Sequence, residues 1–281
     1  MGIGAALSAA AGLAHTRAQA GQRAFRAVVV INMSHAHESQ TVRVVCWNIH
    51  KCVGGTDGRY EPRRIIDCLG AYDAKVILLQ EVARDMPRLH SHDQVAILSE
   101  GLGMHAAFHP EHRFKAGYYG NMILSTYPLS DIQHVDLTIG WRKIRGAIQA
   151  HVRVPIGEHR RSLVVNNLHL GLAGSERAKQ LARFVRCELL AHLHASTPLI
   201  VGGDLNDLWG SLGPKFLAPE NLARAGTLRN TFPAAWPLRP LDGLFFRGSV
   251  RLKHFEVGSS RLAKTASDHR PLVADFEISM S

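Results

Sequence analysis

The sequence predicts an α/β (α+β) domain, and two patterns in the chain support this prediction. In the first part, short apolar runs typical of buried strands alternate with amphipathic stretches typical of helices, as in layered α/β proteins. From residue 104 to 154 the pattern changes to short strands separated by turn residues, which is typical of antiparallel sheets and sandwiches. These patterns alone leave an open sheet and a sandwich as alternatives.

The composition is that of a globular protein with a strongly basic charge balance. Of the 281 residues, 46% are hydrophobic and 20% charged, and a chain of this size buries most of its apolar surface without disulfides. The four cysteines form neither a CxxC pair nor a zinc spacing, so we expect buried free thiols and a reducing compartment. No apolar run is long enough to span a bilayer. The net charge of +10 favours polyanionic partners, either nucleic acid or anionic lipid.

Residues 1–40 differ from the rest because they are rich in alanine and carry three arginines against one glutamate. Residues 5–14 resemble a signal-peptide core and Ala18-Gln19-Ala20 a cleavage site, but no positive charge precedes the apolar part. We interpret residues 1–40 as a disordered or mis-assigned extension, with translation beginning at Met33 as one possibility. The expected location is the cytoplasm, with export as the alternative.

The first predicted strand covers residues 42–49, which are rich in β-branched side chains. A helix is expected over residues 61–72, with Pro62 in its first turn. Residues 75–81 form a second buried strand that ends on an acid, and residues 93–102 another helix. This strand–helix–strand unit is the source of the α/β prediction.

The second half begins with strands, and the clearest helix of the chain follows at residues 175–194, where apolar side chains recur at helical spacing. A short buried strand over residues 198–204 then ends on two glycines, and a loop covers residues 209–240. The other expected strands cover residues 119–125, 132–137, 147–154, 163–170, 241–246, 250–257 and 271–276.

Many of these strands end on polar side chains. Taken singly, each such residue is as well explained by a solvated strand end, an Asx turn or a satisfied core histidine. Together they indicate one shared pocket at a sheet edge. The residues are Asn48, Glu81, Asn167 with His169, Asp204 with Asn206, Asp242, and Ser267-Asp268-His269.

The order of these motifs resembles the endonuclease/exonuclease/phosphatase superfamily, which includes DNase I-like nucleases, abasic-site endonucleases, neutral sphingomyelinases and inositol polyphosphate 5-phosphatases. Residues 120–125 also look like the central strand of that family. The resemblance extends from Val42 to Phe276 and implies a catalytic domain over residues 41–281. It implies a DNase I-like, four-layer β-sandwich of two mixed sheets flanked by helices. The motifs are Trp47-Asn48, Gln80-Glu81, Asn167-Leu168-His169-Leu170, Gly203-Asp204-Leu205-Asn206, Asp242-Gly243-Leu244-Phe245 and Ser267-Asp268-His269.

The resemblance also implies a metal site. Glu81 would be the principal ligand, with Asn48 and Asp268 beside it. Oxygen ligands suit Mg²⁺, and Mn²⁺ is the expected substitute. Two further residues, Asn121 and Arg145, are expected to bind substrate. For Arg145, a solvated surface charge is the alternative.

By the same resemblance, Asp204 orients or deprotonates the attacking water and Asn206 binds the phosphate. His269, paired with Asp242, contacts the phosphate as an imidazolium or acts as a base. His169 stabilises developing charge or protonates the leaving oxygen. The division of acid and base roles between Asp204 and the histidines stays open.

These observations predict a Mg²⁺-dependent, monomeric phosphodiesterase that acts on nucleic acid as an endonuclease or exonuclease. A phospholipid or sphingomyelin phosphodiesterase or a small-molecule phosphatase is the alternative enzyme. A lipid substrate requires an apolar membrane-contacting loop, for which residues 212–217 and 241–246 are the candidates. The short, glycine-rich loop at residues 52–60 argues against a dedicated abasic-site enzyme. A nucleic-acid-binding module without catalysis is the alternative outside enzymes.

Overall fold

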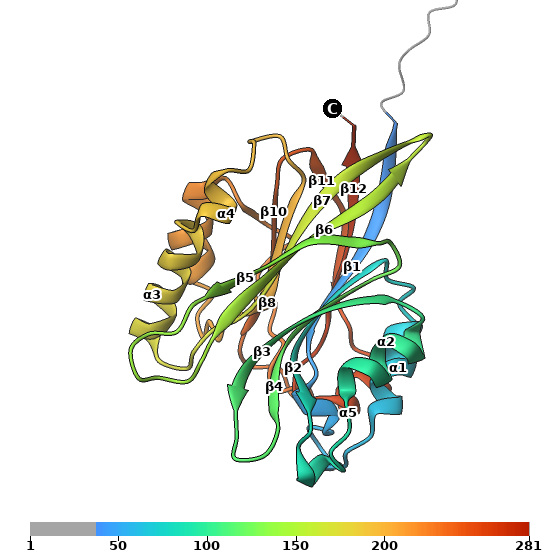
Figure 1. Cartoon of the computed structure of the whole chain (residues 1–281), viewed down its shortest axis with the longest axis vertical. Coiled ribbons are helices and arrows are strands. Elements are labelled where there is room, and N and C mark those ends of the chain that lie inside the picture. Colours follow the sequence, from blue (N-terminus) through green and yellow to red (C-terminus); the bar gives the residue numbers. More distant parts are fainter. Residues whose placement is uncertain (1–37, 281) are drawn as a thin grey trace, which may run out of the picture. The chain divides into compact units, whose positions relative to one another are not determined.

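Two six-stranded mixed sheets face each other in the computed structural model, which describes residues 38–280 (Figure 1). The extension interpreted over residues 1–40 therefore lies almost wholly outside the described residues. The first sheet has the order β11 (Val250–Val257), β12 (Leu272–Ser279), β1 (Ser39–Asn48), β2 (Val76–Arg84), β4 (Tyr118–Ser125) and β3 (His105–Arg113). The second has the order β5 (Leu129–Asp136), β6 (Gly146–Ile156), β7 (His159–His169), β8 (Leu199–Asp204), β10 (Asp242–Arg247) and β9 (Ala223–Arg224).

The sheets pack through alternate apolar side chains, and helices cover their outer faces. Val44, Leu78 and Ile200 belong to the core between the sheets. Outside the first sheet lie α1 (Pro62–Gly70), α2 (Gln94–Leu102) and α5 (Arg261–Ala266), and outside the second lie α3 (Gly174–Val185) and α4 (Glu188–Ala191) (Figure 1). The four-layer sandwich implied by the resemblance is confirmed.

Strand β2 does not end at Glu81, as the sequence analysis expected, but continues to Arg84. Leu79 pairs with Met122 and Val82 with Gly120, so two residues of β2 lie opposite one residue of β4. Such a bulge leaves one residue outside the regular alternation. Glu81 occupies this bulge with a φ of 58°.

The helix predicted over residues 175–194 is in fact two helices, because Cys187 is extended between α3 and α4. An unbroken helix would continue the apolar stripe of Leu181 and Val185 through Leu189, but the break turns Leu190 instead onto the core that covers the second sheet. No pattern in the sequence predicts strand β3 or helix α5. Residues 209–240, predicted as a loop, include strand β9 and short turns of helix. Shorter turns of helix lie at His50–Cys52, Pro87–Leu89, Gly213–Leu217 and Ala218–Glu220.

The topology brings the predicted polar strand ends to one edge of the sandwich. β1 runs parallel to β2, and β7 parallel to β8, so each pair ends on the same side. β10 runs antiparallel to β8 and begins where β8 ends, with Asp242 opposite Asp204.

All four cysteines are free thiols, as expected, and three of them are buried. Among residues 38–280, no helix has the length and apolar character needed to cross a membrane.

Candidate active site

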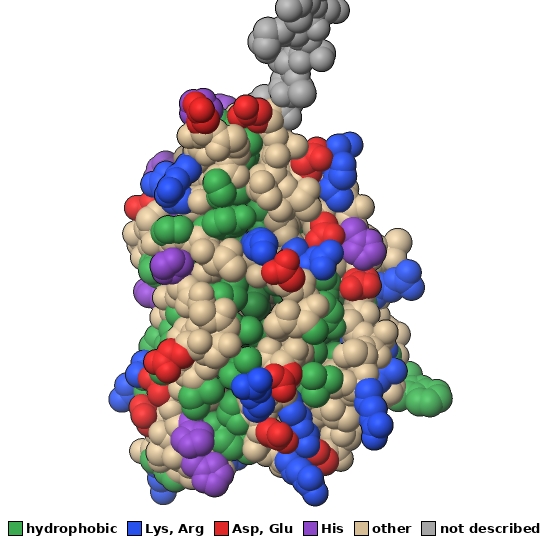
Figure 2. All heavy atoms as spheres, turned by 90° about the vertical axis from the view of Figure 1, so that its right-hand side faces the viewer, with side chains coloured by type: hydrophobic (Ala, Val, Ile, Leu, Met, Phe, Trp, Pro, Cys, Tyr) green, Lys and Arg blue, Asp and Glu red, His purple; other side chains and the backbone are tan. Residues whose placement is uncertain are grey.

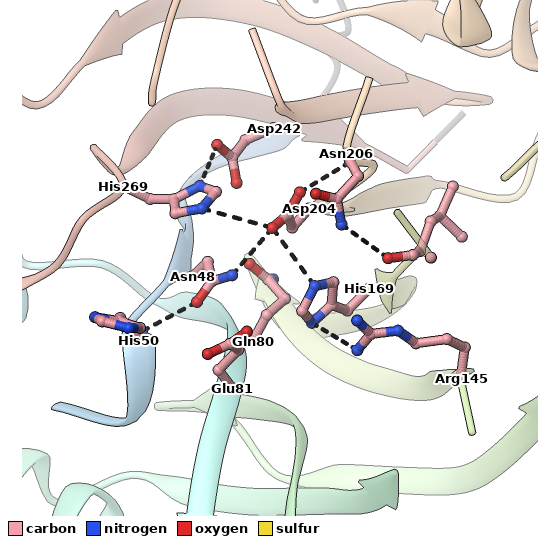
Figure 3. Close-up of polar contacts among 12 residues, drawn as sticks. Asn48, His50, Gln80, Glu81, Arg145, His169, Asp204, Asn206, Asp242 and His269 are labelled. Atoms are coloured by element: carbon pink, nitrogen blue, oxygen red, sulfur yellow. Dashed lines mark hydrogen bonds and ion pairs between the residues drawn. The ribbon is translucent and has the colours of Figure 1, made fainter. Parts of the chain in front are cut away.

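Asp204 is the centre of the site, at the end of β8 and beside His169 of β7 in the sheet register. One of its carboxylate oxygens, Oδ2, meets three side chains (Figure 3). Asn48 Nδ2 donates to it at 3.0 Å, and the Nε2 atoms of His169 and His269 lie at 3.6 and 3.7 Å. The other oxygen accepts the backbone N–H of Asn206 at 2.8 Å. Burial raises the pKa of Asp204 to about 6, against the attraction of the His269 cation.

His269 is held as an imidazolium. Its Nδ1 donates to Asp242 Oδ2 at 2.9 Å, and Thr231 donates its hydroxyl to the same oxygen. Burial alone would lower the pKa of His269, but the carboxylates of Asp242 and Asp204 raise it to about 10. Trp47 fixes the backbone beneath the ring, because its indole N–H donates to the His269 carbonyl at 2.8 Å.

His169 is the neutral counterpart. Burial, and then the positive charges of Arg145 and His269, hold its pKa well below the usual value. Its Nδ1 lies 3.2 Å from Arg145 Nη1, which can only donate, so Nδ1 is the acceptor. The ring proton is therefore on Nε2, which faces Asp204.

Arg145 is positioned by Glu111, a residue that the sequence analysis did not select. Arg145 Nη1 donates to Glu111 Oε2 at 3.3 Å, and Glu111 Oε1 accepts from Asn121 Nδ2 at 2.6 Å and from Gly146 N at 3.0 Å. Burial raises the pKa of Glu111 to about 8. Glu111 follows Pro110 in β3 and belongs to no recognisable motif, so no sequence signal marked it. Asn121 is fully buried and supports Glu111 from β4.

The predicted metal ligands lie beside this network. Glu81 forms an ion pair with the ammonium of Lys51. Lys51 was not predicted from the sequence as a site residue. Burial would raise the pKa of Glu81, but Lys51 lowers it below the usual value and keeps the carboxylate ionised. Asn48 Oδ1 accepts the His50 N–H at 3.0 Å, and Asp268 Oδ1 lies 3.9 Å from His50 Nδ1. The turn formed by residues 50–52 thus links all three predicted ligands.

Two sets of residues could be considered for a metal. The ligating atoms of Asp204, Asp242 and His269 lie within 4.8 Å of one another. A protonated imidazole has no free lone pair, so the state of His269 does not fit a ligand. Glu81, Asn48 and Asp268 offer two carboxylates and an amide oxygen, and this donor set fits Mg²⁺.

Beneath the site, two buried amides connect the sheets. Gln80 Nε2 donates to Asn167 Oδ1 at 2.7 Å. Asn167 Nδ2 donates in turn to the carbonyls of Leu79 and Met122 at 2.8 and 2.9 Å. Asn206 completes the surroundings of Asp204, since its Nδ2 donates to the Leu170 carbonyl at 2.8 Å. The predicted residues of both sheets are therefore brought to one edge, and the Gln80–Asn167 bond fixes their alignment.

Comparison with known proteins identifies the family. The sequence pattern of the endonuclease/exonuclease/phosphatase family matches residues 45–269. The chain belongs to this family. Its members are generally hydrolases of phosphoesters and typically depend on a divalent metal.

Similar proteins agree with this assignment. The Escherichia coli K12 protein YbhP is 26% identical over 249 residues, covering 84% of this chain and 96% of YbhP. A family member from Beutenbergia cavernae is 26% identical, with a TM-score of 0.71 over 85% of this chain and 72% of that one. The catalytic domain of human Nocturnin, solved with a bound sulfate anion, is 21% identical with a TM-score of 0.67. It matches over 84% of this chain and 94% of its own, and shares the fold.

Proposed function

We propose that the protein is a Mg²⁺-dependent phosphodiesterase that cleaves nucleic acid. The observation that carries the proposal is the convergence on Asp204 Oδ2 of one cationic and one neutral histidine, at 3.7 and 3.6 Å. Hydrolysis of a phosphodiester is favoured by a base for water, a cation for the phosphoryl oxygens and a hydrogen-bond donor for the charge on the leaving oxygen. These three groups supply all of them.

In this mechanism Asp204 orients the attacking water and accepts its proton, and a pKa near 6 suits a base at neutral pH. His269, cationic through Asp242, binds a phosphoryl oxygen, as does the amide of Asn206. His169 carries its proton on Nε2 and donates a hydrogen bond to the leaving oxygen, which stabilises the charge that develops there, and the departing oxygen takes its proton from water.

Glu81, Asn48 and Asp268 would hold the Mg²⁺, or Mn²⁺ in its place, and the bound ion would neutralise charge on the phosphoryl oxygens. Lys51 keeps Glu81 ionised and therefore ready to accept a cation. Arg145 adds positive charge next to His169.

Nucleic acid is favoured over lipid for two reasons. The net charge of +10 suits a polyanion. The two candidate membrane loops are wrong, because Leu212, Leu217, Leu241 and Phe245 are buried. The basic residues are not concentrated on every face of the protein. On the face shown in Figure 2, Lys and Arg are interspersed with Asp and Glu.

The test is nicking of supercoiled plasmid with Mg²⁺ and with EDTA. We expect cleavage only with Mg²⁺ and loss of cleavage in Asp204→Asn. Asp73→Asn is the matched control, because Asp73 is exposed and its ion pair is with the nearby Lys75, which precedes β2, at the opposite end of that strand from Glu81. Failure to cleave, with hydrolysis of a small phosphodiester intact, would move the substrate to lipids or small phosphates. Binding without any hydrolysis would leave a non-catalytic module.

A further inference from the structure

A pocket of about 600 Å³ opens next to the catalytic centre, between the loop from β5 to β6 and the loop from β7 to α3. The mechanism above uses none of it except Arg145. Its wall combines an indole, an exposed leucine, three cations and bare backbone. The main lining residues are Trp141, Arg142, Lys143, Arg145, Gly171 and Leu172.

The pocket is continuous with the reacting groups. Arg145 lines it and also lies 3.2 Å from His169. Gly171 directly follows Leu170, whose carbonyl holds Asn206. The charge of Lys143 contributes to the low pKa of His169, so this ammonium acts on the catalytic centre. A substrate group bound in the pocket would therefore be only a few covalent bonds away from the scissile phosphate.

The pocket exposes apolar side chains to water, and burying this apolar surface would favour the binding of a partner. The Trp141 side chain is 94% exposed and Leu172 is 70% exposed. The Arg142 guanidinium lies 6.0 Å from the centre of the Trp141 ring and also pairs with Glu176 at 3.4 Å. That ion pair anchors the loop to α3. Three cations face one acid, so the pocket attracts anions.

We propose that this pocket is a nucleotide subsite for single-stranded nucleic acid, in which an unpaired base stacks on Trp141 and the next phosphate binds Lys143 and Arg142. The inference rests on the proposed function and specifies its substrate. Base stacking on an aromatic ring beside cations is how proteins hold single strands. A base in a duplex already has both faces stacked on its neighbours and cannot offer one to Trp141.

The other exposed indoles near the site differ from Trp141. Trp209 has the Arg239 guanidinium 4.8 Å from its ring centre. Trp236 is 76% exposed, on a loop whose Ala234 N–H donates to the Asp268 carbonyl. Neither of them lines the pocket. Trp236 therefore serves as the matched control for an exposed tryptophan at the rim.

The experiment measures binding in EDTA, where no cleavage occurs, by fluorescence anisotropy of labelled (dT)8. The proteins are the full chain, Trp141→Ala, Trp141→Phe and Trp236→Ala. Stacking of one base predicts a Kd raised about 5- to 150-fold in Trp141→Ala, largely restored in Trp141→Phe and unchanged in Trp236→Ala. An abasic oligomer with the same phosphates should bind the wild type and Trp141→Ala equally. A long, GC-rich, fully paired duplex should show no dependence on Trp141.

Three results would overturn the subsite. These are equal (dT)8 affinities for wild type and Trp141→Ala, an equal loss on the abasic oligomer, and the absence of (dT)8 binding by the wild type. Sedimentation with phosphatidylglycerol vesicles, if it depends on Trp141 while (dT)8 binding does not, would make the pocket a membrane contact instead. Hydrolysis is measured separately. If (dT)8 binds through Trp141 but neither (dT)8 nor supercoiled plasmid is cleaved with Mg²⁺, the proposed function fails and the subsite stands.

Discussion

Replacing Asp242 with Asn tests the electrostatic core of the site without changing its shape. The substitution removes the charge that faces His269 Nδ1 at 2.9 Å and keeps an oxygen there as an acceptor. Two other carboxylates act on the same ring, those of Asp204 and Asp268, and both remain. Any change in the titration of His269 is then due to Asp242.

The size of the effect follows from the geometry. Charge centres about 4 Å apart attract by about 4 kcal/mol at an effective dielectric of about 20, which equals about three pKa units. We therefore expect the pKa of His269 to fall from about 10 to about 7 in the variant. A raised pKa stabilises the fold fully below the unfolded value near 6.5, and the contribution is lost as the pH rises to 10.

The assay is urea unfolding in EDTA at pH 7.5, 8.5 and 9.5. The wild type should lose about 1.2 kcal/mol of unfolding free energy per pH unit relative to Asp242→Asn, which amounts to about 2.4 kcal/mol across the range. Asp242 also raises the pKa values of Asp204 and Cys46, but Asp204 titrates below this pH range and Cys46 above it, so both cancel in the difference. Asp73→Asn should follow the wild type. A wild-type minus variant difference that does not change with pH would refute the assignment of an imidazolium to His269.

Two further substitutions test the metal site and the turn at the end of β8. Glu81→Gln should raise the Mg²⁺ concentration needed for half-maximal cleavage at least about tenfold and weaken Mn²⁺ binding measured by calorimetry. The exposed control Glu158→Gln should do neither. Equal metal affinities for wild type and Glu81→Gln would remove Glu81 from the site. Gly203→Ala should lower the Tm by at least about 5 °C, because φ is 154° and a Cβ would lie 1.9 Å from the Leu168 carbonyl oxygen. Gly70→Ala is its control, since nothing lies within 4 Å of that Cβ, and an equal Tm for both variants would contradict the argument.

The layered fold was predictable because local patterns of apolar residues indicate its strands and helices. Alternating and continuous apolar runs identify strands such as β1 and β8 whatever their partners are. Helix α5 escaped because it spans only six residues, too few to show a clear period. The break at Cys187 escaped for a different reason. It depends on how Leu190 fits the core, which is a property of the assembled layers.

The site residues also fall into two groups, those that sequence motifs indicate and those that depend on the assembled fold. Asn48, His169, Asp204 and His269 stand in motifs, and the structure brings them within hydrogen-bonding or ion-pair distance of one another. Glu111 acts through its buried hydrogen bonds to Arg145, Asn121 and Gly146, and these depend on contacts between distant segments. Lys51 reaches Glu81 from a turn whose three residues all have positive φ. The sequence around Lys51 contains no glycine until Gly54, so no residue type there indicates the positive φ angles.

The bulge in β2 has a consequence for how the protein loses activity when it is stressed. Because strand pairing continues on both sides of Glu81, the amides that flank it are protected by the sheet itself. Hydrogen exchange at Leu79 and Val82 should then require opening of the whole sandwich, while the loop that carries Trp141 exchanges in the native state. Mild denaturation would loosen the grip on substrate before it disturbs the reacting groups. Recognition and chemistry would therefore fail at different temperatures.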